Sequence, residues 1–215
     1  MINVLLFASG IGNRWTAGYP KQLALVEGIP VIRRTVNQLI ARGITPTLIT
    51  FDTDIVDAVD GLTEVYYSPP STKWSNTFLG SEELWKGRTL PFHADVVWDP
   101  HALDIVLGST GLHFFGTLKG PWENFAISFD PEHYDDMRKA AQAALRSRPA
   151  KDARCGTWEV YRSLVGIPLG EDRRFENKVR VELKTSPWSD YTYDFDKMSR
   201  YEEFMKHNPW ARSEK

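Results

Sequence analysis

The chain has 215 residues, which is enough for one domain with a sizeable core but too few for two comfortable ones. Its 26 basic and 28 acidic side chains give a formal net charge of −2, so there is no electrostatic argument for a nucleic-acid or membrane partner. No stretch approaches the roughly 20 apolar residues needed to span a bilayer. The single cysteine, Cys155, cannot form an internal disulfide, which favours a cytoplasmic location.

The first fifty residues predict a β-α-β unit. Residues 2–8 form an apolar run without the basic start of a signal peptide, which is typical of a strand buried on both faces. Apolar residues recur with helical spacing over 30–42, and Gly43 follows where a helix usually stops. Residues 47–51 are expected to form the second strand, joined to the first by a right-handed crossover.

The rest of the chain alternates further strands and helices. Asp99-Pro100 and Asp130-Pro131 each place a capping side chain before a proline, which predicts helices over 100–107 and 130–148. The other expected elements are strands over 64–67, 90–97, 112–118, 124–129, 179–184 and 191–195, and helices over 77–86, 157–165 and 197–207. Together they predict a single α/β Rossmann-like domain over 1–210, with a mixed, mostly parallel sheet flanked by helices, and a frayed tail over 211–215.

A glycine loop follows the first strand. Residues 8–14 read Ala-Ser-Gly-Ile-Gly-Asn-Arg and lie at the carboxyl end of that strand, where open α/β sheets bind ligands. The two glycines let backbone N–H groups approach phosphate oxygens closely. The loop is neither a dinucleotide fingerprint, because Trp15 stands where the third glycine belongs, nor a Walker A loop. Arg14 and Lys21 add the positive charge that a triphosphate requires, so the loop predicts an NTP site.

The motifs around this loop resemble those of a known family. Residues 6–14, 20–23 and 28–30 resemble L-A-A-G-x-G-x-R, P-K-x-L and G-x-P, in that order, and residues 31–39 are similar to the helix that follows. This signature belongs to the nucleotidyltransferases that activate sugar phosphates and phosphocholine. The resemblance implies a nucleotide-binding set made of Ala8, Ser9, Gly10 and Gly12.

A later segment points to the nucleotide base. Residues 75–81 resemble the N-x-x-x-S-L segment of choline-phosphate cytidylyltransferases, which implies that Asn76 and Ser81 border the base. Since this is the subgroup that the segment resembles most, CTP is the preferred donor.

Two segments imply a magnesium site. The residues around Asp95 resemble G-D-V-V-F-D-P, and those that end at Asp196 resemble w-Y-E-I-D, segments whose aspartates hold Mg²⁺ in the family. Carboxylate and phosphate oxygens are the ligands that Mg²⁺ prefers. Asp99 and Asp194 are rival candidates, although helix capping explains Asp99.

The implied reaction is the transfer of a nucleoside monophosphate, with CMP preferred, from an NTP to a small phosphorylated acceptor, with release of pyrophosphate. Arg14 would hold the β- and γ-phosphates, and Lys21 would neutralise charge on the α-phosphoryl oxygens. The acceptor is expected to be phosphocholine-like or a sugar phosphate. Lys119 and Lys178 are candidates to hold its phosphate, and the resemblance is compatible with a homodimer.

Two alternatives stay open. A glycosyltransferase that uses a nucleotide sugar can share this fold and carries a D-x-D motif, which residues 194–196 match, but so late a position argues against it. A non-catalytic nucleotide-binding protein is the second alternative. Trp15, Trp74, Trp122 and Trp158 are expected either to form a cage for a quaternary ammonium or to stack against a sugar.

Overall fold

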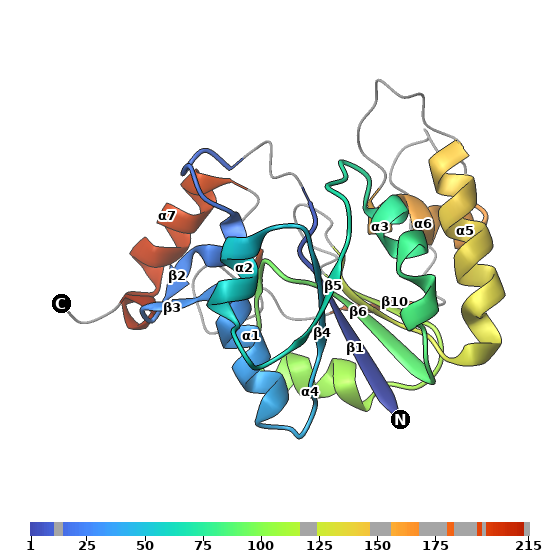
Figure 1. Cartoon of the computed structure of the whole chain (residues 1–215), viewed down its shortest axis with the longest axis horizontal. Coiled ribbons are helices and arrows are strands. Elements are labelled where there is room, and N and C mark those ends of the chain that lie inside the picture. The colour runs from blue at the N-terminus through green and yellow to red at the C-terminus, as the bar shows by residue number, and fades with distance from the viewer. Residues whose placement is uncertain are drawn as a thin grey trace.

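The computed structural model describes residues 1–10, 15–116, 124–146, 156–167, 180–182, 193–194 and 197–212. Within these residues, seven strands form one sheet (Figure 1). Their order across the sheet is β10 (Arg180–Glu182), β8 (His113–Gly116), β9 (Asn124–Ser128), β6 (Arg88–His93), β1 (Ile2–Phe7), β4 (Thr47–Thr50) and β5 (Glu64–Tyr67). Only β9 runs antiparallel to its neighbours in this sheet, so the expected mixed, mostly parallel sheet is confirmed.

Helices cover both faces of the sheet (Figure 1). One face packs against α1 (Val31–Ile40), α2 (Thr53–Ala58) and α4 (Pro100–Gly108). The other packs against α3 (Trp74–Gly80), α5 (Tyr134–Arg146) and α6 (Thr157–Val165). Each face therefore has its own apolar cluster, with the sheet between them. None of the helices in the described residues is long and apolar enough to cross a membrane.

The expected β-α-β unit is β1, α1 and β4, and the two strands pair in parallel, with Leu6 opposite Leu48. Helix α1 forms here because its apolar positions fall on one stripe, where Ile32, Val36 and Leu39 are fully buried. The chain then turns at Gly43, whose φ of 73° suits a residue without a side chain.

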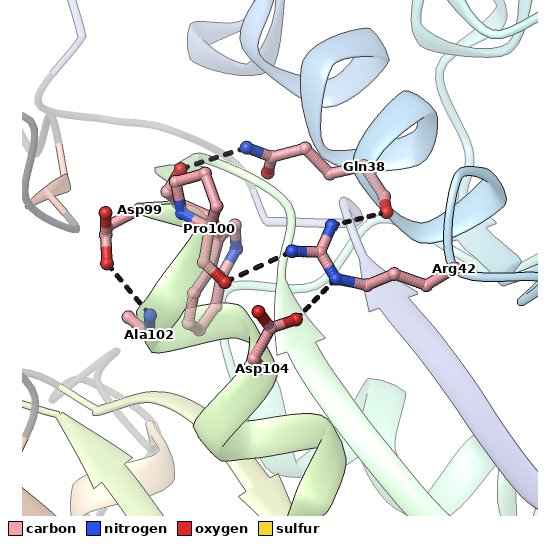
Figure 2. A network of polar contacts seen from close by, with 7 residues as sticks. Gln38, Arg42, Asp99, Pro100, Ala102 and Asp104 are labelled. Carbon is pink, nitrogen blue, oxygen red and sulfur yellow. Dashed lines mark hydrogen bonds and ion pairs between the residues drawn. The ribbon is translucent and has the colours of Figure 1, made fainter.

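A polar network joins α1 to the start of α4 (Figure 2). The Arg42 guanidinium donates from Nε to Asp104 Oδ1 at 2.6 Å and from its terminal nitrogens to the carbonyls of Gln38 and Pro100. The Gln38 amide in turn donates to the Trp98 carbonyl at 3.2 Å. These bonds fix the segment between β6 and α4 against α1.

Two of the expected elements were wrong in their bounds. The strand expected over 90–97 is two strands: β6 stays in the main sheet, whereas β7 (Val96–Val97) pairs with β11 (Tyr193–Asp194) in a separate antiparallel pair. The chain leaves the main sheet between them, at Ala94 and Asp95. The helix expected over 77–86 begins at Trp74 instead and ends at Gly80, followed by the 3-10 turn η2 (Glu82–Leu84).

A third apolar cluster lies beside the sheet. The short strands β2 (Leu25–Val26) and β3 (Ile29–Pro30) form a hairpin, which packs with α7 (Met198–His207) and the 3-10 turn η5 (Pro209–Ala211) (Figure 1). Ala211 is buried and its carbonyl accepts from the Glu27 N–H at 2.6 Å. Residues 213–215 of the expected tail lie outside the described residues.

Candidate functional site

The carboxyl ends of four parallel strands, β5, β4, β1 and β6, meet at one edge of the sheet. The segment that follows β1 lies there between the segments that follow β6 and β5. The Ala94 N–H donates to the Phe7 carbonyl at 3.2 Å, and the Ser71 N–H donates to the Ser9 carbonyl at 3.4 Å. Gly10 also forms an isolated parallel bridge with Ser71. The start of the glycine loop is thus held from both sides.

The predicted nucleotide-binding residues Ala8, Ser9 and Gly10 occupy this position. The Ser9 side chain is buried, and its hydroxyl donates to the Ile49 carbonyl at 3.0 Å, which ties the loop to β4. A Cβ added to Gly10 would meet no atom of the described residues within 4 Å, so the backbone here is open on that side. Gly12 and Arg14, the other predicted loop residues, lie outside the described residues.

Lys21 and Asp95 form an ion pair at the same edge. Lys21 opens the 3-10 turn η1 (Lys21–Leu23), and Asp95 stands at the bend between β6 and β7. Both side chains are shielded from water, with 18% of the Lys21 side chain and 9% of the Asp95 side chain exposed. The structure therefore brings together a predicted catalytic cation and a predicted metal ligand.

The protonation of Asp95 follows from its surroundings. Burial disfavours its charged form, but the Lys21 ammonium and, to a smaller extent, the nearby His93 outweigh burial, so the pKa of Asp95 is lowered. Asp95 is therefore an ionised carboxylate at neutral pH, which is the form that binds a cation.

A pocket of about 290 Å³ opens beside this pair. It is walled by the end of β1 and by parts of residues 15–22 and 51–55, and Lys21 is one of its lining residues. Three aromatic side chains, Trp15, Tyr19 and Phe51, also line it. Its mixed lining of aromatic, backbone and charged groups is typical of a small-molecule site.

The two residues predicted to border the base lie in or just after α3. Asn76 is exposed, and its side-chain amide donates to the Ser71 hydroxyl at 3.5 Å, next to the bridge between Ser71 and Gly10. Ser81 follows α3 and is fully buried, with its hydroxyl donating to the Phe78 carbonyl at 3.0 Å. The structure brings Asn76 toward the glycine loop, but it does not bring the Ser81 hydroxyl there.

The rival metal ligand Asp99 caps a helix. Its Oδ2 accepts from the Ala102 N–H at 2.9 Å at the start of α4, with Pro100 in the first turn (Figure 2). Of the second pair of candidates, Asp194 belongs to β11 and lies opposite Val96, whereas Asp196 lies outside the described residues. The described residues hold no group of three or more His, Cys, Asp or Glu side chains placed around one point. A single carboxylate such as Asp95 still suits Mg²⁺, because this ion is commonly held by one or two carboxylates, substrate phosphates and water.

Asn124 is a buried polar residue to which none of the sequence motifs points. It is 6% exposed, and among the described residues neither polar atom of its side chain has a hydrogen-bond partner. Buried amides are normally paired, so such a side chain is a candidate to bind a ligand. Asn124 is the first residue of β9 and lies opposite Gly116 of β8. A polar residue at the start of the otherwise apolar run 124–127 was the available signal.

The expected aromatic cage does not form among the tryptophans that the structure describes. Trp15 packs in the cluster around α7, whereas Trp74 and Trp158 pack on the helical layer of α3, α5 and α6. Trp122 lies outside the described residues, as do Lys119 and Lys178, the two candidates for the acceptor phosphate.

Solved structures share this fold, although neither a protein-family model nor a curated protein matches the sequence. An inositol-1-phosphate CTP transferase from T. maritima aligns over 98% of this chain and 97% of its own, with 12% identity and a TM-score of 0.62. A nucleoside-diphosphate-sugar pyrophosphorylase from Vibrio cholerae RC9 aligns over 96% and 100%, with 13% identity and a TM-score of 0.57. A UDP-glucose pyrophosphorylase from Acinetobacter baumannii aligns over 97% and 93%, with 14% identity and a TM-score of 0.57. At these identities the likeness shows that the chain has the fold of these proteins.

Proposed function

We propose that this protein is a nucleotidyltransferase, which transfers a nucleoside monophosphate from an NTP to a small phosphorylated acceptor. The observation that carries the proposal is the ion pair of Lys21 and Asp95 beside the start of the glycine loop and the pocket. The shared fold with proteins named as a CTP transferase and as pyrophosphorylases supports the same reaction class.

The reaction forms one bond and breaks one bond at the α-phosphorus of the NTP. A phosphate oxygen of the acceptor attacks this phosphorus, and the bond to the oxygen that bridges the α- and β-phosphates breaks, so pyrophosphate leaves with the electron pair. Negative charge grows on the α-phosphoryl oxygens during the transfer, and the Lys21 ammonium would neutralise it. Arg14 is proposed to hold the β- and γ-phosphates.

The metal in this proposal is Mg²⁺, held by Asp95 and Asp196. Asp95 supports the assignment because it is an ionised carboxylate paired with Lys21, which lines the pocket. The pairing of β11 with β7 supports Asp196. Asp194, two residues before Asp196, lies opposite Val96, and Val96 directly follows Asp95 in the chain. When bound, Mg²⁺ would supply positive charge that neutralises the phosphates of both substrates.

The donor is proposed to be CTP, and the acceptor phosphocholine-like or a sugar phosphate. Asn76 would border the base, because its amide lies next to the bridge between Ser71 and Gly10. Asn124 is proposed to bind a polar group of the acceptor. Its burial supports this role, and so does its lack of a partner among the described residues.

Pyrophosphate release tests the proposal directly. Each of the four NTPs is mixed with Mg²⁺ and with either phosphocholine or one of a panel of sugar 1-phosphates. We expect release only when donor, acceptor and Mg²⁺ are all present, with CTP the fastest donor. No release from any combination would contradict the proposal. Release of a nucleoside diphosphate from a nucleotide sugar would indicate a glycosyltransferase instead, and NTP binding without turnover would indicate a non-catalytic protein.

A further inference from the structure

The carboxyl-terminal part of the chain contacts both sides of the candidate site. Tyr193 and Asp194 of β11 pair with β7, which follows Asp95 directly. Helix α7 packs against the β2–β3 hairpin, which follows η1 and Lys21 in the chain (Figure 1). The carboxyl-terminal part of the chain therefore contacts β7, which follows Asp95, and the hairpin that follows Lys21.

Tyr201 is the residue of α7 that reaches the pocket wall. Its ring meets Trp15 edge-on, with the ring centres 5.9 Å apart, and its hydroxyl donates to the Leu25 carbonyl at 2.7 Å. Trp15 also meets Tyr19 edge-on at 5.9 Å, and both of these residues line the pocket together with Lys21. A continuous row of three aromatic rings therefore runs from α7 to the pocket.

The pocket wall depends on such contacts because it has little regular structure. Residues 15–20 form neither a helix nor a strand, and Lys21 follows them directly. A segment of this kind is held mainly by side-chain packing, and an edge-on aromatic contact fixes both distance and orientation. Trp15 is half-buried against the cluster around α7, which makes it the anchor of the segment.

We propose that Tyr201 is a positioning residue of the nucleotide site. Through Trp15 it holds residues 15–20 in place, and thereby sets where Lys21 meets Asp95. The proposal rests on the proposed function in one respect, namely that the pocket binds the NTP.

Binding measurements on two variants test this role. The affinity for CTP, UTP, ATP and GTP with Mg²⁺ is measured by calorimetry for the wild type, Tyr201→Ala and Tyr201→Phe. We expect Tyr201→Ala to lower the affinity for the preferred NTP roughly tenfold, which is at the upper end of the effect of losing one aromatic contact. Tyr201→Phe keeps the ring, so we expect it to restore affinity to within about threefold of the wild type.

A matched control separates positioning from general damage to α7. Phe204 is buried in the same helix and meets Trp210, so Phe204→Leu removes packing without changing the ring at Tyr201. We expect this control to lower Tm at least as much as Tyr201→Ala does, with the NTP affinity unchanged within about twofold. Equal affinity of wild type and Tyr201→Ala would overturn the proposal, as would an equal loss in the control.

Hydrogen exchange keeps the test independent of the proposed function. Backbone amides of 15–25 are expected to exchange faster in Tyr201→Ala than in the wild type, while those of β6 are unchanged. If the wild type binds none of the four NTPs, the proposed function fails, and exchange still decides the role of Tyr201. Unchanged exchange over 15–25 would then overturn that role.

Discussion

Lys21 approaches Asp95 from the short turn η1, and the two side chains are more shielded from water than a surface pair would be. In this setting the Lys21 ammonium balances the Asp95 carboxylate and at the same time faces the pocket. In the proposed mechanism, a bound triphosphate would compete with Asp95 for that ammonium. Lys21 could therefore exchange Asp95 for a phosphate group as its partner when a ligand binds.

Replacing Lys21 is the sharpest test at this scale. In the proposed mechanism Lys21→Ala removes the charge that stabilises the α-phosphoryl oxygens, so we expect kcat to fall by about 10²-fold or more, with the fold retained. Steady-state pyrophosphate release measures the effect, and circular dichroism checks the fold. Lys86→Ala is the matched control, because Lys86 is exposed and precedes β6, at the opposite edge of the sheet. Near-normal turnover of Lys21→Ala would contradict the proposed role of Lys21 in neutralising the α-phosphoryl oxygens.

At the scale of elements, the bend between β6 and α4 places Asp95. β6 ends at His93, β7 turns away to pair with β11, and α4 begins at Pro100. The network around Arg42 and the Asp99 cap hold this segment against α1 (Figure 2). Asp95 thus sits on a bend whose two ends are both fixed.

The two aspartates of this segment are expected to differ in a measurable way. Asp99→Ala should lower the free energy of unfolding by about 1 kcal/mol, the usual loss for a helix cap, and leave the Mg²⁺ dependence of turnover unchanged. Asp95→Asn should instead raise the Mg²⁺ concentration needed for half-maximal rate. Denaturant unfolding and magnesium titrations measure the two effects. A changed Mg²⁺ requirement in Asp99→Ala would make Asp99 the ligand.

At the scale of the whole molecule, the ion pair joins the loop after β1 to the bend after β6, so its charge state contributes to global stability. The pKa of Asp95 is lowered in the folded protein, so its contribution is present above the unfolded-state pKa and is lost as pH falls through the folded value. Without Lys21, the buried carboxylate would lose its ion-pair partner at neutral pH.

Acid unfolding tests this linkage. We expect the wild type to exceed Lys21→Met in free energy of unfolding at pH 7. The difference should shrink as the pH falls toward the lowered pKa of Asp95 in the wild type, because burial without Lys21 lets Asp95 gain its proton at a higher pH in the variant. Urea unfolding at a series of pH values measures the difference. A constant difference from pH 7 to pH 3 would show that the charge of Asp95 does not contribute.

Local patterns predicted much of the fold. The apolar run at β1, the helical spacing at α1 and the Asp-Pro start of α4 each appear at or within a few residues of their expected bounds. These signals are local, since they come from burial, periodicity and capping within one segment. The expectation of a single domain over 1–210 stays a prediction.

The sequence by itself determined an α/β fold with a glycine loop after the first strand, because those features depend on neighbouring residues. Its motifs also predicted Lys21 as a catalytic residue and, separately, Asp95 as a metal ligand. Only the tertiary structure decided that these two side chains meet and that Asn124 is buried opposite Gly116. Both features depend on strand order or register, and the pairing of strands that lie far apart in the chain cannot be predicted from either strand alone.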